Sequence, residues 1–503
     1  MHSKVGAVGT ACFLIFSATP VLGQTAKEWF RDGQAAVARA KKTQPITGKA
    51  RNVILFVGDG MGVSTVTASR ILEGQQRGES GEENLLSFEK FPYTALVKTY
   101  TTDMQTPDSA GTMNAMVTGV KTKGWMLGLT ARAKFGDVAS ASGNELTTIL
   151  DLAERGGLAT GIVTTTRLTH ATPAALYAHT PDRHWEDDGW IPATARMAGA
   201  VDVARQFIEY DVGDGLEVAL GGGRGNFRPS SAVDPEDPAV WGHRADGRDL
   251  TEEWTKRPRS AYVWNRAGFD AIDPSTTDHL LGLFQPSHMR YEHDRLGDSA
   301  GEPSLSEMTA KALDLLARNK KGFFLMVEGG RIDHAHHSTN AYRALVDTIE
   351  FAKAVSVAVR KTDRRETLII VTADHSHVFT IAGYAQRGQP ILGIVESADE
   401  RFNEVLHELN HDAKGKRFSI LGYANGPGAL CDAPRPVLTN ALTTAPDYRQ
   451  EATVRMAVET HGGEDVPLYA DGPQAHLFRG VIEQNVIFHV MVDALGLKAP
   501  APP

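Results

Sequence analysis

The sequence is poor in cysteine, and this scarcity limits how the chain can be stabilised. Among its 503 residues it has two cysteines, Cys12 and Cys431. Cys12 lies in a segment that we expect to be removed on export, so Cys431 is alone in the mature chain. A disulfide within one mature chain is therefore excluded, although export implies an oxidising destination. Stability must come from a large core, from bound metal or from association.

A surplus of positive charge is missing too. The chain carries 52 Lys and Arg against 61 Asp and Glu, a formal net charge of −9, and no run of basic residues offsets it. We therefore expect no nucleic-acid-binding surface, because such surfaces need a basic field. A small anionic substrate is still compatible with this composition, since a local cationic site can act inside an acidic protein.

Long apolar runs are absent from both ends of the chain. The apolar stretch at residues 11–16 follows a lysine and leads to small residues before Gln24. This pattern predicts a signal peptide over residues 1–23, cleaved near Gly23/Gln24, and the stretch is too short for a comfortable membrane span. The final KAPAPP has no apolar tail for a lipid anchor. We expect a secreted or periplasmic protein without a membrane anchor.

What the sequence does contain is an alternation of buried strands and amphipathic helices. The strand-like runs are residues 52–60, 160–166, 322–330 and 367–375, and the helix-like segments are 145–157, 304–319 and 340–361. The pattern indicates an α/β protein with a parallel sheet buried on both faces. In such sheets, ligands gather beyond the carboxyl ends of the strands.

Three other segments do not follow this alternation of strands and helices. Residues 24–45 form an isolated amphipathic helix, which suits an arm that packs elsewhere or on another subunit. Residues 226–303, rich in Pro, Asp and Gly, are expected to be a folded excursion and not part of the core. Residues 378–459 mix Gly, Pro and short apolar runs and predict an inserted subdomain.

Carboxylates and imidazoles follow the predicted strands. They are Asp59 in GDGMG, then Glu328, Asp333, His334, His336 and His337 in EGGRIDHAHH, then Asp374, His375 and His377 in TADHSH, and His461 in THGGED. A helical turn would place Asp333 and His337 on one face. Imidazole with carboxylate is a zinc ligand set, whereas carboxylates, hydroxyls and waters suit magnesium. A solvated polar loop is the alternative for residues 328–337.

The stretch MQTPDSAGTMNAM, residues 104–116, allows two interpretations of Ser109. It predicts a helix N-cap at Asp108 or Ser109. It is also compatible with a nucleophile at a helix N-terminus, where backbone N–H groups favour a phosphate. The local sequence leaves both open. A cation beside Ser109 would favour the second, because it would deprotonate the hydroxyl at neutral pH.

The order of the motifs resembles that of the alkaline phosphatases, and of their animal branch in particular. The motifs are GDGMG, PDSAGT, TTTRLTHATPAALYAHTPDR, FFLMVEGGRIDHAHH, VTADHSHVF, THGGEDVPLYA and GPQAHLF, between about Trp29 and Val490. The resemblance implies a three-layer sandwich over residues 46–503, with a large mostly parallel central sheet flanked by helices. The insertion at about 378–459 would be a crown-like subdomain.

The resemblance also implies roles for individual residues. Ser109 would be the nucleophile that becomes phosphoserine, and Arg183 would grip the phosphate bidentately. One zinc would be held by Asp333, His337 and His461, a second by Asp59, Asp374 and His375, and one magnesium by Asp59, Thr172 and Glu328. Asp108, His170 and His334 would be neighbours of these groups, with Asp108 orienting Arg183, and His336 and His377 would be hydrogen-bonding supports.

The sequence departs from the family pattern in three places. Thr172 stands where animal enzymes usually have serine, and because both offer a hydroxyl the site should survive. The disulfide cysteines and the anchor-bearing tail of the animal enzymes are missing, which favours a bacterial secreted member. The animal calcium site would map to Glu236, the Phe284 backbone, Gln285 and Glu302, where Gln285 replaces a carboxylate and weakens the site.

We expect an enzyme that hydrolyses phosphate monoesters through a phosphoserine intermediate, using two zinc ions and one magnesium, as a homodimer by resemblance. Its rate should rise toward alkaline pH. A phosphodiesterase or sulfatase of the same superfamily is the alternative within enzymes, but Arg183 and the third metal site favour the monoester dianion. A phosphate- or metal-binding scavenger without turnover is the alternative outside them. The sequence does not identify the physiological substrate.

Overall fold

The computed structural model describes residues 25–396, 410–430 and 435–503. The expected signal peptide over residues 1–23 lies outside the described residues. The chain divides into two compact units, Met1–Thr43 and Gln44–Pro503. Among the described residues, no helix combines the length and the apolar character that a membrane span requires.

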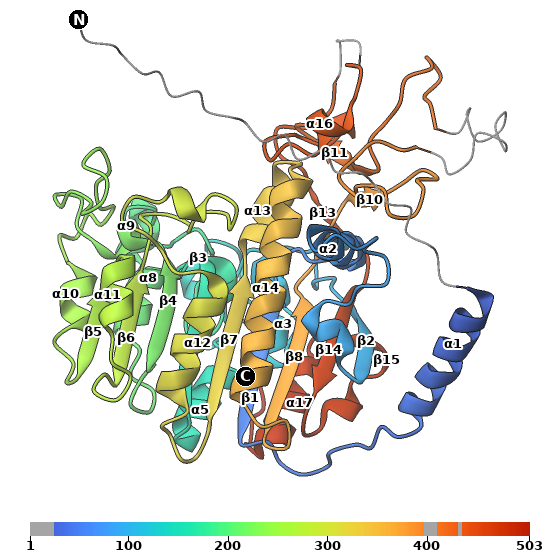
Figure 1. The fold of residues 1–503 in the computed structure, drawn as a ribbon. Helices are drawn as coiled ribbons and strands as arrows, with labels where there is room; N and C mark the ends of the chain where they lie inside the picture. The colour runs from blue at the N-terminus through green and yellow to red at the C-terminus, as the bar shows by residue number, and fades with distance from the viewer. Residues whose placement is uncertain (1–24, 397–409, 431–434) are drawn as a thin grey trace, which may run out of the picture. The chain divides into compact units, whose positions relative to one another are not determined.

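The first unit contains helix α1, Ala26–Ala40, which lies within the predicted arm (Figure 1). Its start is set by a capping box in which Thr25 and Glu28 accept from each other's backbone N–H groups. The helix is amphipathic, but none of its residues is buried: Trp29 is 53% and Phe30 70% exposed. The described residues of this unit therefore do not bury its apolar side chains.

The second unit is built on one ten-stranded sheet, with the strand order β15-β2-β14-β8-β1-β7-β3-β4-β6-β5. All neighbouring strands are parallel except that β14 runs antiparallel to both β2 and β8. The strands are β1 (Asn52–Gly58), β2 (Tyr93–Lys98), β3 (Ala159–Arg167), β4 (Val218–Gly222), β5 (Ser260–Val263), β6 (His279–Leu283), β7 (Phe323–Gly329), β8 (Thr367–Ala373), β14 (Val466–Asp471) and β15 (Gly480–Glu483). The predicted mostly parallel α/β sheet is confirmed.

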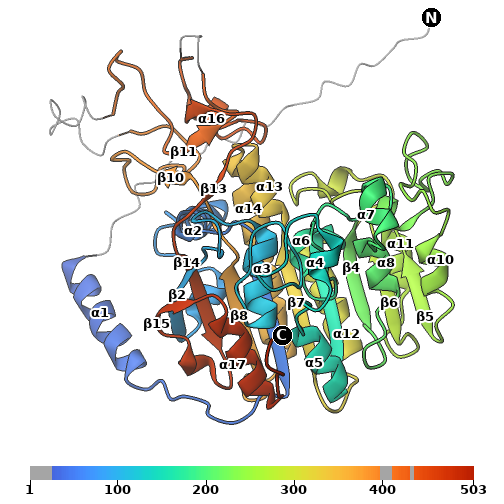
Figure 2. The ribbon, with the colours of Figure 1, turned by 180° about the vertical axis from the view of Figure 1, so that it is seen from behind.

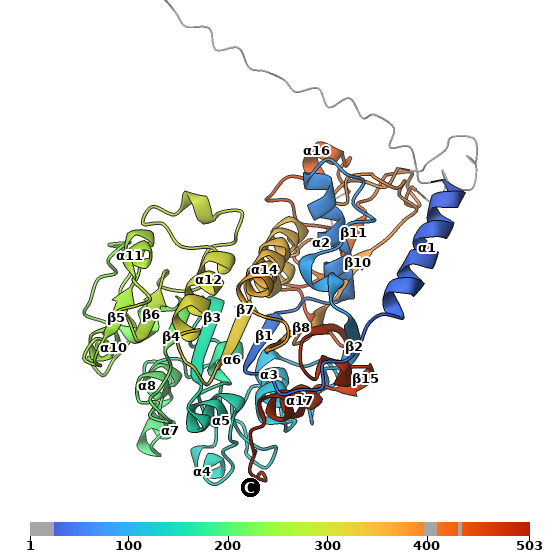
Figure 3. The same ribbon diagram turned by 60° about the horizontal axis from the view of Figure 1, so that its bottom comes forward.

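Helices cover both faces of this sheet. Figure 3 shows α2 (Val63–Gln76), α12 (Leu305–Leu316) and α14 (Ala341–Lys361) on one face, and α14 contacts both other helices. Figure 2 shows α3 (Ser109–Thr118), α5 (Ile149–Gly156) and α17 (Val486–Leu495) on the opposite face, where each contacts the other two. The three-layer arrangement expected from the sequence is confirmed.

The central strands form the core because both of their faces are buried. Residues 53–57 of β1 and 324–327 of β7 have no exposed surface. Each fully buried Val, Leu, Ile or Phe side chain contributes about 1.5–3 kcal/mol relative to its exposed state. This rigid core fixes the ends of β1, β7 and β8, from which the polar residues of the sequence motifs project.

The expectation for residues 226–303 was wrong. This segment supplies β5 and β6, which extend the central sheet beyond β4 through parallel pairing. The two strands have only four and five residues and lie among polar loops, so their apolar signal in the sequence is weak. Short helices accompany them: α7 (Ala193–Met197), α8 (Val203–Ile208), α9 (Arg224–Phe227), α10 (Leu250–Trp254) and α11 (Arg266–Ala271).

The segment predicted as an insertion contains a small separate sheet. Its strands are β10 (Phe379–Ile381), β11 (Leu421–Gly426) and β12 (Ala452–Arg455), with the short helix α16 (Asn440–Thr443) nearby. A two-stranded ladder, β9 (Ser376–His377) with β13 (His461–Gly462), joins the two ends of the segment and pairs His377 with His461. This pairing brings two of the sequence motifs together.

Candidate metal and phosphate site

The polar motifs meet at the carboxyl edge of the central sheet. Gly58, the last residue of β1, pairs with Gly329 of β7 and with Ala373 of β8, so the three strands end side by side. Asp59 follows β1 and Asp374 follows β8, while the helix α13 (Arg331–His337) begins just after β7. The structure therefore brings together the residues that the sequence places at separate strand ends.

Asp333, His337 and His461 form the first group. Asp333 Oδ1 lies 3.2 Å from His337 Nε2 and 3.4 Å from His461 Nε2. The two Nε2 atoms are 3.2 Å apart. Asp333 and His337 share one face of α13, as their spacing predicts.

The other nitrogen of each imidazole in this group is engaged by a backbone carbonyl. His337 Nδ1 donates to the Glu459 carbonyl at 2.6 Å, and His461 Nδ1 donates to the Pro107 carbonyl at 2.8 Å. Both Nε2 atoms then carry lone pairs that face each other and the Asp333 carboxylate. The repulsion is relieved by a proton on His337, whose pKa Asp333 raises against the effect of burial, or by a cation among the three atoms, and the three ligand atoms fit a zinc ion.

His377 and Glu459 lie behind this group. His377 Nε2 is 2.9 Å from Asp333 Oδ1, and its Nδ1 is 2.6 Å from Glu459 Oε2. Burial opposes protonation, but Glu459 and Asp333 together raise the pKa of His377 to about 10. An imidazolium between two carboxylates fits the predicted supporting role. His336 is likewise occupied, by Thr65 Oγ1 at 3.0 Å and by the Tyr423 hydroxyl at 2.8 Å.

Asp59, Asp374 and His375 form the second group, and all three are fully buried. His375 Nε2 lies 3.3 Å from Asp59 Oδ1 and 3.3 Å from Asp374 Oδ2. Neither oxygen of Asp59 has a hydrogen-bond partner among the described residues, and nor does Asp374 Oδ2. Burial and the nearby Asp374 raise the pKa of Asp59 well above its usual range. Buried acceptors without donors fit a second cation.

Glu328 belongs to a third group that also includes Asp59. Ligand atoms of Asp59, His170 and Glu328 come within 4.8 Å of one another. Glu328 Oε1 has no hydrogen-bond partner in the described structure, and burial raises the pKa of Glu328 to about 7. The hydroxyl of Thr172, in the short helix α6 (Ala171–Ala174), also has no hydrogen-bond partner among the described residues. A carboxylate-and-hydroxyl set of this kind fits magnesium.

Two threonines that the sequence reasoning missed orient Glu328. Both Thr164 and Thr166 donate a hydroxyl to Glu328 Oε2, the latter at 3.0 Å. They lie in β3, the neighbour of β7, and Thr164 pairs directly with Glu328. The run of threonines at the end of a predicted strand was the available signal.

Ser109 is the first residue of α3, and Asp108 is its N-cap. Asp108 accepts from the backbone N–H groups of Ala110 and Gly111, at 3.2 Å each. Ser109 is buried, and its Oγ lies 3.2 Å from His375 Nε2. The two interpretations of this stretch are therefore compatible: the helix is capped at Asp108, and the Ser109 hydroxyl faces the second group.

Arg183 is held beside Ser109 by two side chains. Its guanidinium donates to Asp108 Oδ2 at 2.9 Å and to His170 Nε2 at 3.1 Å. Burial and the adjacent Arg183 lower the pKa of His170 well below its usual range, which keeps the imidazole neutral and able to accept. The guanidinium is thus oriented, with a side chain that is 11% exposed.

His334 lies near this pair, together with a histidine that the sequence reasoning missed. The His334 ring is 5.6 Å from the His170 ring and 4.2 Å from the His288 ring. Its Nδ1 is bound by the Arg331 guanidinium at 2.9 Å. His288 follows β6 in the segment 226–303, so the misjudged strand also hid this residue.

The residues of the expected calcium site lie together at the end of β6. Gln285 Nε2 donates to Asp298 Oδ1 at 2.8 Å, so a fifth residue, Asp298, joins the set of Glu236, Phe284, Gln285 and Glu302. The side chains of Glu236 and Asp298 are 8% and 0% exposed, and Glu302 is 2% exposed. Burial and Asp298 raise the pKa of Glu236, and burial raises that of Glu302 to about 8. Asp298 Oδ2 and Glu302 Oε2 lack partners among the described residues.

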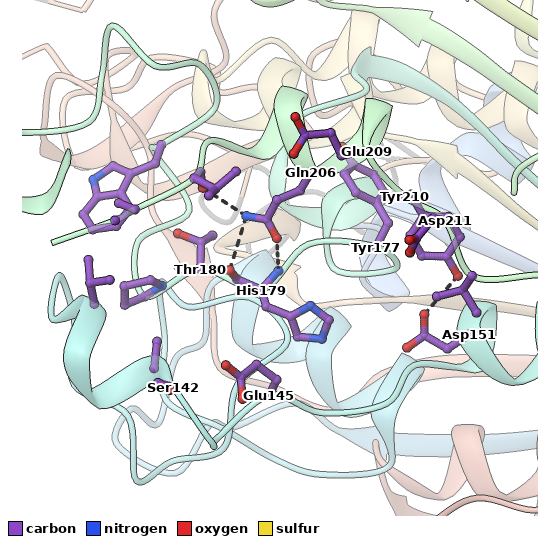
Figure 4. A pocket seen from close by; sticks show the side chains of 18 of the residues that line it. Ser142, Glu145, Asp151, Tyr177, His179, Thr180, Gln206, Glu209, Tyr210 and Asp211 are labelled. Carbon is purple, nitrogen blue, oxygen red and sulfur yellow. Dashed lines mark hydrogen bonds between the residues drawn. The ribbon is translucent and has the colours of Figure 1, made fainter. Parts of the chain in front are cut away.

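A cavity of about 550 Å³ lies elsewhere in the second unit (Figure 4). Its lining includes Glu145, Asp151, Tyr177, His179, Gln206 and Tyr210, and the polar groups there are largely paired: Gln206 bonds with the His179 backbone, and Tyr210 donates to Asp151 at 2.9 Å. No residue that the sequence predicts for the site lines this cavity. The candidate site is thus defined by converging polar groups and not by cavity size.

Comparison with known proteins identifies the family of this chain. Residues 50–497 match the family model described as alkaline phosphatase. The chain is 45% identical to the tissue-nonspecific alkaline phosphatase of Gallus gallus over 93% of this chain and 88% of that protein. It is 42% identical to the Homo sapiens isozyme over 98% and 94%.

Among solved structures, the alkaline phosphatase of Thermus thermophilus superposes with a TM-score of 0.64 and 25% identity. The superposition covers 92% of this chain and 95% of that one. With the family model spanning most of the chain and relatives above 40% identity over nearly their full length, this chain belongs to the alkaline phosphatase family of phosphate-monoester hydrolases.

Proposed function

We propose that this protein hydrolyses phosphate monoesters through a phosphoserine formed on Ser109. The observation that carries the proposal is the position of the Ser109 hydroxyl. It lies at the N-terminus of α3, 3.2 Å from His375, and the residue before it holds the Arg183 guanidinium. The closeness of these three groups supports their proposed roles as nucleophile, metal ligand and phosphate-binding guanidinium.

Three cations are part of the proposal, and the residues fit them as described above. Asp333, His337 and His461 would hold one zinc, Asp59, Asp374 and His375 a second, and Asp59, Thr172 and Glu328 a magnesium. When bound, such ions lower the pKa of a hydroxyl or a water molecule and neutralise charge on the phosphoryl oxygens.

The chain's own groups bind and orient the substrate. Arg183, fixed by Asp108 and His170, offers its planar fork to two phosphoryl oxygens. The first N–H groups of α3 add partial positive charge at the same place. Ser109 Oγ forms a bond to phosphorus as the ester P–O bond breaks, and the departing alkoxide takes up a proton. Water then attacks the phosphoserine, which releases inorganic phosphate and restores the hydroxyl.

Replacement of the nucleophile tests the proposal. Ser109→Ala should lower turnover of p-nitrophenyl phosphate by at least about 10³-fold. It should also abolish the trapping of phosphate on the protein at low pH, measured by intact-protein mass. Ser231→Ala, at an exposed serine, is the matched control and should behave like the wild type. A Ser109→Ala protein that still gains a phosphoryl group would overturn the assignment.

Substrate class is tested separately. Arg183 and the Glu328 group together suit a monoester dianion better than a diester or a sulfate. We expect p-nitrophenyl phosphate to be turned over faster than bis(p-nitrophenyl) phosphate and p-nitrophenyl sulfate. A preference for either of the other two would point to the diesterase or sulfatase alternative, and tight phosphate binding without hydrolysis in zinc would point to a scavenger.

A calcium ion in the Glu236 group is part of the same proposal, with Asp298 supplying the carboxylate that Gln285 lacks. In the part of the chain that the structure describes, the carboxylates of this group face two guanidinium groups, those of Arg224 and Arg290; the carboxylates are those of Asp234, Glu236, Asp298 and Glu302. A divalent cation would balance the remaining two negative charges. Asp298→Asn should lose about one calcium per chain and keep its zinc, by elemental analysis, while equal calcium in both proteins would exclude the site.

We also propose export and a homodimer. Export rests on the signal-peptide pattern of residues 1–23, and a mature protein that keeps Met1 by mass spectrometry would contradict it. The dimer rests on the family resemblance and on the apolar side chains of α1, which the described residues of its own unit do not bury. A Trp29→Ser/Phe30→Ser double variant should shift sedimentation toward the monomer, whereas an unchanged dimer would exclude an essential role for the arm.

A further inference from the structure

Trp125 adopts a backbone conformation that is unfavourable for its side chain. Its φ of 65° lies in the left-handed region, which bulky residues rarely occupy. Two hydrogen bonds hold the Trp125 backbone in this conformation. Its N–H donates to Asp108 Oδ1 at 3.0 Å, and its carbonyl accepts from the backbone N–H of Arg183 at 2.9 Å. Strain of this kind persists where the surrounding structure imposes it, and it is common at functional sites.

The strained backbone leaves the indole at the surface of the site. Trp125 is 43% exposed. Its ring centroid lies 5.8 Å from the Arg183 guanidinium carbon, within the range of a cation–π contact. The indole is therefore accessible to a molecule that is held at the Arg183 guanidinium.

His184 extends the exposed aromatic surface. Its ring stacks on the Trp125 ring, with centroids 5.8 Å apart and planes 22° apart. His184 is itself fixed by Asp182, whose Oδ1 accepts from the His184 N–H at 2.9 Å and lies 2.8 Å from its Nδ1. Two rings are thus pre-oriented next to Arg183.

We propose that Trp125, supported by His184, is a specificity-determining residue that contacts the leaving group of the monoester and favours aromatic alcohols. The inference rests on the proposed function, because Arg183 must hold the phosphoryl group. The ester oxygen and the first atoms of the leaving group then lie within a few ångströms of the guanidinium. An aromatic leaving group can stack on the exposed indole, whereas an aliphatic one gains less.

The test compares two substrates whose leaving alcohols have similar acidity and differ in an aromatic ring, 2-phenylethyl phosphate and n-butyl phosphate. The ratio of their kcat/KM values should fall about three- to tenfold in Trp125→Leu, the range expected for loss of one aromatic contact. Trp125→Phe, which keeps a ring, should retain part of the preference. Inhibition by the matched 2-phenylethyl and n-butyl phosphonates should show the same ratio change in binding alone.

Trp190 provides the matched control. It is 67% exposed and makes no ring or cation contact among the described residues, so Trp190→Leu should leave both ratios unchanged. Wild-type ratios in Trp125→Leu, for both turnover and phosphonate inhibition, would overturn the inference. Failure of the proposed function is distinguishable from this outcome, because then no variant would hydrolyse either monoester.

Discussion

At each end of strand β3, threonines of the strand donate hydrogen bonds to glutamates. The two groups differ in whether a proton or a metal cation best balances the glutamate charge. At the amino end, the Thr160 N–H donates to Glu217 at 2.6 Å and its hydroxyl donates to Glu154. At the carboxyl end, Thr164 and Thr166 donate to Glu328. Burial raises the pKa of all three glutamates, to about 7 for Glu154, 8 for Glu217 and 7 for Glu328.

The difference lies in the neighbours. Beside Glu328, neither oxygen of Asp59 and only Oδ1 of Asp374 has a donor among the described residues, and the imidazole lone pairs there face inward. One carboxyl proton can join only two of these acceptor atoms, whereas a cation can interact with several of them at once, so a cation is the better partner. Beside Glu154 and Glu217 the main further charge is Asp214, and one proton on each carboxyl is sufficient. A raised pKa alone therefore does not distinguish a metal site from a protonated structural pair; the number of converging acceptor atoms does.

The largest expected effect is a difference in enzymatic activity between variants at the two ends of β3. Glu328→Gln should lower kcat/KM for p-nitrophenyl phosphate by about 100-fold, with loss of magnesium, because it removes a charged ligand atom. Glu154→Gln should keep both activity and metal content. Equal losses of activity and magnesium in the two variants would show that the two glutamates do not differ in metal binding.

Removal of metal should affect the thermal stability of variants at the two ends of β3 differently. A cation bound at 1,000 times its Kd adds about 4 kcal/mol per site to the folded state. Chelator should therefore lower the Tm of the wild type and of Glu154→Gln by similar amounts, measured by scanning calorimetry. It should lower that of Glu328→Gln by less, since this variant has a site fewer to lose. Three identical decreases would argue against a cation at Glu328.

The smallest effect concerns the amino end and depends on pH. Folding raises the pKa of Glu154 from 4.5 to about 7 and that of Glu217 to about 8. The folded chain then binds more protons than the unfolded chain between these values. The protonation of these two glutamates in the folded chain contributes stability that is fully present below pH 4.5. This contribution is lost as the pH rises through 7 and 8. Glu154→Gln cannot ionise, so it should be more stable than the wild type at pH 9 by about 1–2 kcal/mol.

At pH 5 the same variant should show little or no gain, because Glu154 is then protonated in the folded wild type. Urea midpoints at the two pH values make the comparison. A gain of the same size at both would show that the amide stabilises for a reason unrelated to ionisation.

Much of the fold and of the site could be predicted from the sequence. The strands at 52–60, 322–330 and 367–375 were recognisable because central parallel strands are apolar on both faces, and the metal-ligand candidates follow them directly. Glu459, Thr164 and Thr166 were missed because they act through other side chains. Their own local sequence does not show which residue they orient.

In the segment 226–303, by contrast, the sequence did not predict the strands. Its strands β5 and β6 are short and lie at the edge of the sheet, so their apolar character does not exceed that of a loop. Missing them also hid His288 and Asp298, which follow β6. For Trp125 the sequence indicated no role, since neither its left-handed backbone nor its neighbour Arg183 is readable from residues 104–128.

What the sequence by itself determined is the family and the carboxylate, imidazole and hydroxyl groups at the strand ends, because the proposed metal ligation and nucleophilic attack need these side chains there. Tertiary structure alone decided how those groups pair. The distances among Asp333, His337 and His461, and the placement of Trp125 against Arg183, arise from strands and loops far apart in the chain. Which acceptor atoms lack donors depends on that packing, and it is this property that separates the carboxyl end of β3 from its amino end.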